Sequence, residues 1–189
     1  MKNKALLLHW WWWNSSENWL PWLKLEFEKT WINTFVPDLP DTDNPDLKKQ
    51  LVSLSNFNIE NLDIMVWHSL GCQLAVKFLE EKNIENSRII LVAPTYPNLA
   101  IELWKDVLRD SYDSIEKYYN VNLDFEKINK LNNEFIVFLS NNDPYINMEN
   151  AKKYYSKLEN VKFIDFKDKW HFNKSAWVLE LSEILECLK

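Results

Sequence analysis

Three residues that could act together chemically lie far apart in the sequence: Ser69, Asp143 and His171. A histidine can take the proton of a serine hydroxyl, and an aspartate can hold that histidine in the required tautomer and orientation. Each of the three follows a short apolar run of the kind that forms β-strands, so we expect each in a loop after a strand. Their order, serine, aspartate and then histidine, is the order that α/β-hydrolases use. The set predicts acyl transfer through a covalent acyl-enzyme on Ser69.

The segment around Ser69 carries the strongest local signal. A buried strand is expected to end at Val66, and a helical pattern starts directly after Ser69. A serine on such a sharp turn projects its hydroxyl at the carboxyl edge of the sheet. The backbone N–H of Leu70 then points to the place where an oxyanion would form. The alternative interpretation is that Ser69 is only a helix N-cap, a position that serine favours.

Taken singly, the other two residues also have plainer interpretations. Asp143 precedes Pro144, an arrangement typical of a turn. His171 lies in a loop, where a lone histidine is usually a surface residue. The order of all three residues after successive strands favours the catalytic interpretation over these alternatives.

Several neighbouring residues are expected to shape the site. His9 ends the first predicted strand, beside the loop that commonly supplies a second oxyanion donor, for which we expect the backbone N–H of Trp11. His68 should pack or hydrogen-bond locally, and Trp67 and Trp170 stand near the nucleophile and the base. The three histidines have no metal-ligand spacing and no glycine-rich phosphate loop exists, so neither a metal nor another cofactor is expected.

Short apolar runs alternate with helical patterns along the chain, which predicts a single α/β domain over residues 1–189. Most runs are continuous rather than alternating, as in parallel strands that helices cover on both faces. The expected strands are Ala5–His9, Ile32–Val36, Leu62–Val66, Ile89–Ala93, Phe135–Leu139 and Val161–Phe166. The expected helices cover about 15–30, 45–54 with Asn44 as its cap, 70–82, 98–119, 124–131, 148–158 and 174–188.

The bulk composition narrows the function classes. The 189 residues are 47% hydrophobic and 26% charged, with a formal net charge of -6 and a pI of about 5.2. An acidic chain is a poor partner for nucleic acid or an anionic membrane, and no apolar stretch indicates a signal peptide or membrane span. Cys72 and Cys187 form no disulfide framework, so a cytoplasmic location is expected. The expected partner is a small-molecule acyl substrate; the sequence identifies no protein partner.

Together these segments resemble the small serine hydrolases of the retinoblastoma-binding protein 9 type. The resemblance runs over nearly the whole chain and includes 17–23, 36–40, 68–72, 92–94, 140–145 and 171–172. It implies an α/β-hydrolase fold without a large lid domain, with Ser69, Asp143 and His171 as nucleophile, acid and base. It also implies a carboxylic ester or similar small acyl compound as substrate.

The chain departs from that family at its glycines. It holds 1 glycine and 11 tryptophans, where on the order of 13 glycines would be usual. The family's glycine-rich loop after His9 is replaced by Trp10–Trp13, and the first glycine of its Gly-x-Ser-x-Gly motif by Trp67. Trp31, Trp170 and Trp177 also fall where the resemblance implies glycine. An altered or engineered sequence, a degenerate pseudo-enzyme and misassigned glycines all remain open.

Tryptophan at these positions puts activity in doubt. We expect Trp67 to displace the neighbouring strand or to enter the substrate space, and Trp170 to crowd the imidazole of His171. A shift of about 1 Å in a reacting group can cost on the order of 10²-fold in rate. The alternative function is therefore a catalytically inactive binding protein on the same fold, with Trp10–Trp13 as an aromatic surface.

Overall fold

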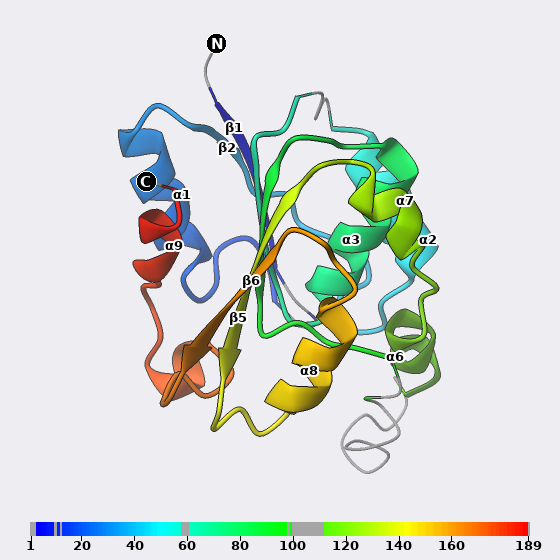
Figure 1. Cartoon of the computed structure of the whole chain (residues 1–189). Coiled ribbons are helices and arrows are strands. Elements are labelled where there is room, and N and C mark those ends of the chain that lie inside the picture. The colour runs from blue at the N-terminus through cyan, green and yellow to red at the C-terminus, as the bar shows by residue number, and fades with distance from the viewer. Residues whose placement is uncertain are drawn as a thin grey trace.

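The computed structural model describes residues 3–9, 11, 13–57, 61–97, 99 and 112–188. Six parallel strands form one sheet in the order β2-β1-β3-β4-β5-β6 (Figure 1). Their bounds are β1 Lys4–Leu8, β2 Asn33–Phe35, β3 Ile64–His68, β4 Arg88–Val92, β5 Glu134–Ser140 and β6 Val161–Phe166. All six predicted strands are present, and the α/β class with a parallel sheet is confirmed.

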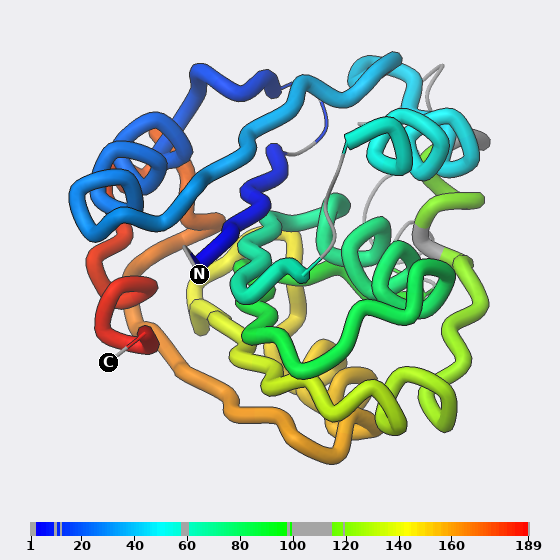
Figure 2. The backbone as a smooth tube through the Cα atoms, turned by 90° about the horizontal axis from the view of Figure 1, so that it is seen from above, coloured from blue at the N-terminus to red at the C-terminus, as the bar shows by residue number. Residues whose placement is uncertain are grey.

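Helices cover both faces of the sheet. They are α1 Leu20–Lys29, α2 Leu47–Ser55, α3 Gly71–Lys82, α6 Tyr112–Tyr119, α7 Phe125–Asn129, α8 Met148–Tyr155 and α9 Glu183–Glu186. Helices α1 and α9 lie on one side, and α2, α3 and α7 on the other (Figure 1). The perpendicular view shows the same separation (Figure 2). This double cover explains why β1, β3 and β4 are almost continuously buried and apolar.

The strand β3 extends two residues beyond the predicted end at Val66. Trp67 pairs in register with Leu8 of β1 and Leu91 of β4, and His68 pairs with Val92. Pairing with β1 as far as Trp67 and with β4 as far as His68 therefore carries the strand up to the residue before Ser69. The turn that follows is correspondingly tighter than the sequence pattern indicated.

Two of the predicted helices differ in their ends. The N-cap of α2 is Asp46, whose Oδ1 accepts the Lys49 N–H at 2.9 Å, so the predicted cap Asn44 was wrong. The single helix expected over 174–188 was also wrong. A 3₁₀ turn, Lys174–Ala176, ends at Trp177 with φ 58, and α9 follows separately. Of the helix expected over 98–119, residues 98 and 100–111 lie outside the described residues.

The glycine at position 71 opens α3 against the end of β1. A Cβ built there would lie 3.0 Å from the backbone carbonyl oxygen of His9. Since that contact is with backbone, it cannot be relieved by moving a flexible side chain. This close approach fixes the N-terminus of α3 beside β1 and β3.

Among the described helices, none is long and apolar enough to cross a membrane.

Candidate active site

Ser69 occupies the sharp turn between β3 and α3. Its φ is 51°, a left-handed conformation that costs a non-glycine residue roughly 1–2 kcal/mol. The turn is held by the Ser69 N–H, which donates to the Val92 carbonyl at 2.8 Å. The cap residue of α3 is Leu70, so Ser69 is not its N-cap. The structure therefore favours the strained turn over the capping alternative.

The structure brings the three predicted residues together at one edge of the sheet. The Ser69 Oγ lies 3.0 Å from Nε2 of His171, and Nδ1 of His171 lies 2.8 Å from Oδ2 of Asp143. The Nδ1–H donates to the carboxylate, which leaves Nε2 as an acceptor for the serine hydroxyl proton. The His171 side chain is fully buried and that of Asp143 is 1% exposed. Water is thus largely excluded from the hydrogen bond between imidazole and carboxylate.

The Asp143 carboxylate is fixed by its own loop. Its Oδ1 accepts the backbone N–H groups of Tyr145 at 2.8 Å and Ile146 at 3.1 Å. These bonds agree with the turn interpretation of Asp143, and the same carboxylate accepts the imidazole N–H of His171. With Oδ1 engaged, Oδ2 is directed to His171.

The loop that carries His171 is tied to the start of α1. The Trp19 indole N–H donates to the Phe172 carbonyl at 2.8 Å, and both side chains are fully buried. The Lys174 N–H donates to Oδ1 of Asn18 at 2.8 Å. These contacts join segments about 150 residues apart and hold the imidazole in place.

A second set of bonds joins the loops of the predicted acid and base. Asn142 Oδ1 accepts the Trp170 N–H at 2.9 Å and the Ser140 hydroxyl at 2.8 Å. The Ser140 oxygen in turn accepts the Lys169 N–H at 3.0 Å. Neither Ser140 nor Asn142 was predicted as a site residue. Their only signal is a polar run directly after an apolar strand.

Replacing Asn142 with alanine is expected to lower kcat roughly 10- to 100-fold, because the loop of His171 loses an anchor and the imidazole shifts. KM should change little, since Asn142 is expected to act through His171. The matched control is Asn141→Ala, an exposed neighbour. Steady-state kinetics of the two variants on a chromogenic ester checks this; equal loss in both would contradict it.

His68 also holds the loop that carries His171. Its Nε2–H donates to the His171 carbonyl at 2.9 Å, and its ring stacks on Trp13 with centroids 4.9 Å apart. Burial, and then the nearby His171, hold the pKa of His68 well below its ordinary value. His68 is therefore neutral at neutral pH, in agreement with the local packing and hydrogen bonding predicted for it.

The depressed pKa of His68 predicts a pH-dependent stability. In the unfolded chain His68 binds a proton below about pH 6.5, whereas the folded protein keeps it neutral, so the unfolded state takes up more protons. Stability that is present above pH 6.5 is lost as the pH falls. Between pH 7 and 5.5 the protein should lose more stability than His68→Gln, which cannot titrate at that position. Urea unfolding of both at each pH measures this difference; parallel pH profiles would contradict it.

The residues expected near the oxyanion position come from two elements. Leu70 and His9 are buried at the start of α3 and at the end of β1. The Nε2 of His9 accepts the Leu39 N–H at 2.8 Å, which anchors the loop 36–40. The Trp11 side chain is 7% exposed, and its indole N–H donates to the Asp43 carbonyl at 3.1 Å. Trp10 and Trp12 lie outside the described residues.

Comparison with known proteins decides the family. A model of the family described as serine hydrolase matches residues 5–189, almost the full length. The chain belongs to the serine hydrolase family. The narrower resemblance to the retinoblastoma-binding protein 9 type remains a prediction.

This serine hydrolase has relatives of the same fold. The YdeN protein of Bacillus subtilis (strain 168) is 25% identical over 118 residues, which cover 60% of this chain and 62% of YdeN. The crystal structure of the ydeN gene product superposes with a TM-score of 0.84 at 21% identity, covering 98% of this chain and 96% of that one. Est1E from Butyrivibrio proteoclasticus, solved with ferulic acid bound, gives 0.69 at 11% identity, with 99% and 90% covered. These structures establish the α/β-hydrolase fold.

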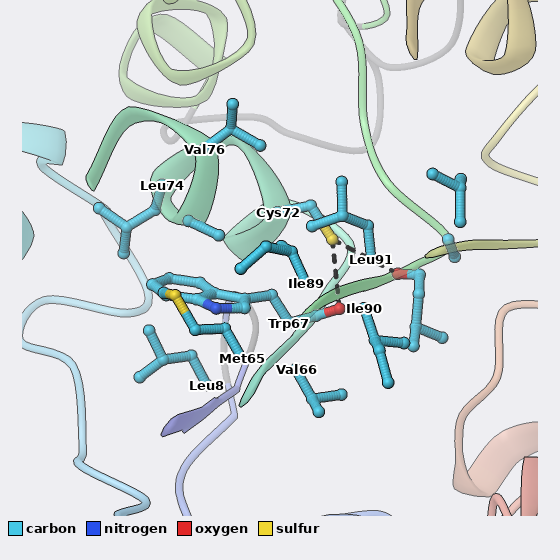
Figure 3. Close-up of a cluster of buried hydrophobic side chains, with 14 of the residues drawn as sticks. Leu8, Met65, Val66, Trp67, Cys72, Leu74, Val76, Ile89, Ile90 and Leu91 are labelled. Atoms are coloured by element: carbon cyan, nitrogen blue, oxygen red, sulfur yellow. Dashed lines mark hydrogen bonds between the residues drawn. The ribbon is translucent and has the colours of Figure 1, made fainter. Parts of the chain in front are cut away.

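In this serine hydrolase the Trp67 indole lies in the core. Its side chain is fully buried between β3 and α3, beside Leu74 and Met65 (Figure 3). Strand β3 keeps its register with both neighbours. The expectation that Trp67 displaces a strand or enters the substrate space was therefore wrong. The adjacent thiol of Cys72 has a pKa raised by burial, and it contacts the Trp67 carbonyl at 3.2 Å.

Trp170 precedes His171 at φ 47. Its ring packs against Tyr145, with centroids 5.6 Å apart, and its N–H is held by Asn142. The Tyr145 ring also meets His171 edge-on at 4.9 Å. His171 keeps its hydrogen bonds to Ser69 and Asp143, so the predicted displacement of the imidazole by Trp170 is not observed.

The described part of the chain holds no group of three or more His, Cys, Asp or Glu side chains arranged to bind a metal ion.

Proposed function

We propose that this serine hydrolase cleaves a small carboxylic ester or similar acyl compound through an acyl-enzyme on Ser69. The observation that carries the proposal is the continuous hydrogen-bonded series from Ser69 through His171 to Asp143. Such a series, with the serine on a strained strand-to-helix turn, has the geometry of an activated nucleophile. Family membership supports the reaction class.

In the proposed reaction the Nε2 of His171 takes the Ser69 hydroxyl proton as Oγ attacks the acyl carbon. The developing oxyanion is stabilised by the Leu70 N–H and by a second donor from the loop after β1, for which we propose Trp11. As the intermediate collapses, the bond to the leaving alcohol breaks and His171 returns the proton to that oxygen. A water molecule, activated by the same imidazole, then hydrolyses the acyl-enzyme. Asp143 holds the tautomer throughout.

The cavity beside the proposed oxyanion donors Leu70 and Trp11 is small. A cavity of about 10 Å³ lies next to Leu70 and Gly71, bounded by His9, Trp11 and Tyr118 among others. That volume holds about one water molecule. Because the cavity that adjoins these proposed donors is small, we propose a short acyl part for the preferred substrate, such as acetyl.

A chromogenic ester series tests the proposal. We expect p-nitrophenyl acetate to be hydrolysed faster than a long-chain ester, and Ser69→Ala to remove the activity. Ser156→Ala, on an exposed residue at the end of α8, is the matched control and should keep it. Absence of turnover together with tight ester binding would favour the inactive binding protein instead.

A further inference from the structure

The described tryptophans divide into two kinds by their surroundings. Trp19 is fully buried, donates its indole N–H to the Phe172 carbonyl at 2.8 Å, and meets the His68 ring edge-on. Trp22 lies within helix α1 and packs against the core. Both positions use what a tryptophan offers, namely apolar area and, at Trp19, a hydrogen-bonded indole.

Trp31 occupies a position where helices favour glycine. It has φ 65 directly after the C-cap of α1. Its N–H donates to the Glu28 carbonyl and the Ile32 N–H donates to the Phe27 carbonyl, both at 3.0 Å. This pair of bonds is the Schellman motif, whose left-handed residue is usually glycine. The Trp31 side chain is 75% exposed and buries little area.

Trp170 and Trp177 share the same backbone conformation. Trp177 has φ 58, ends the 3₁₀ turn, and is 89% exposed. Trp170 has φ 47 inside a turn closed by the Phe172 N–H, which donates to the Lys169 carbonyl at 2.8 Å. For a bulky residue a positive φ is an outlier, whereas glycine adopts it without penalty.

The distribution of positive φ makes the pattern specific. Twelve described residues have it, of which six are Asn or Asp, the non-glycine types that tolerate it best. The others are Trp31, Ser69, Ala93, Trp170, Phe172 and Trp177. Half of this second group is therefore tryptophan, a bulky residue for which a positive φ is an outlier.

At Trp67 the unfavourable feature is the indole N–H and not the backbone conformation. Its indole N–H is buried without a hydrogen-bond partner, unlike that of Trp19. A buried tryptophan N–H usually donates a hydrogen bond to an acceptor. A buried N–H that makes no such bond destabilises the folded state. Trp11 and Trp13 are not of this kind, since Trp11 donates to the Asp43 carbonyl and Trp13 stacks on His68.

We propose that the organism encoding this chain inserts glycine at positions 31, 67, 170 and 177, through a codon that other genetic codes read as tryptophan. The codon UGA meets this requirement, because reassigned codes read it as tryptophan or as glycine. Positions 19 and 22 are then encoded by UGG, the ordinary tryptophan codon. With glycine at these four positions the chain would hold 5 glycines and 7 tryptophans in place of 1 and 11.

Two measurements on the natural source test this. The gene should carry UGA at positions 31, 67, 170 and 177 and UGG at 19 and 22. Tandem mass spectrometry of the protein purified from those cells should find glycine at the four positions and tryptophan at the two controls. UGG at the four positions, or peptides with tryptophan there, would overturn the proposal. Neither readout depends on ester hydrolysis, so the result stands whether or not the proposed function holds.

Discussion

Replacing Asp143 with asparagine is expected to lower kcat by on the order of 10⁴-fold while the fold stays intact. The carboxylate accepts the Nδ1–H of His171 at 2.8 Å and presents Nε2 to Ser69 as an acceptor. An amide nitrogen placed toward Nδ1 would favour the opposite tautomer, in which Nε2 carries the proton and cannot take that of Ser69. The asparagine oxygen can still accept the N–H groups of Tyr145 and Ile146, so the turn should survive.

The matched control is Asp168→Asn, an exposed aspartate just after β6. Its kcat should match that of the unmodified protein. Circular dichroism and thermal unfolding should be similar for all three proteins. Asp143→Asn with the full rate of ester hydrolysis would contradict the assignment of Asp143 as the residue that orients the base.

The second large effect concerns stability. Changing Trp31, Trp170 and Trp177 together to glycine is expected to stabilise the protein by roughly 3–6 kcal/mol, since each left-handed non-glycine residue costs about 1–2 kcal/mol. For a chain of this size that corresponds to a rise in Tm on the order of 10 °C. The two most exposed of these indoles bury little area, so little packing is lost.

Trp19→Gly is the control for this experiment. Because Trp19 is fully buried and hydrogen-bonded, its removal should destabilise the fold by at least about 3–5 kcal/mol. Thermal unfolding and urea titration of the triple variant, the control and the parent protein give the three values. A triple variant less stable than the parent would contradict the account of these turns.

The sequence predicted the strand order along the chain and the loops that carry Ser69, Asp143 and His171. That worked because continuous apolar runs are a direct consequence of burial on both faces of the sheet. The end of β3 was misplaced, since Trp67 is held in the strand by pairing with Leu8 and Leu91, a contact between distant segments. Such tertiary pairing is not visible in local periodicity.

The supporting contacts of the site were harder to predict. The bond from Trp19 to the Phe172 carbonyl and the bonds around Asn142 connect loops that are distant in sequence. The helix expected over 174–188 failed for a local reason, because Trp177 takes a left-handed conformation that interrupts it. No propensity scale predicts that conformation for tryptophan.

Labelling with a serine-directed fluorophosphonate tests the central claim most directly. We expect one adduct per chain, located on Ser69 by peptide mass spectrometry. It should be absent in Ser69→Ala and form much more slowly in Asp143→Asn. The same experiment on the Trp31, Trp67, Trp170 and Trp177 to glycine variant should give the same adduct. Adduct formation that persists in Ser69→Ala, or its absence from both the protein and the glycine variant, would contradict Ser69 as the nucleophile.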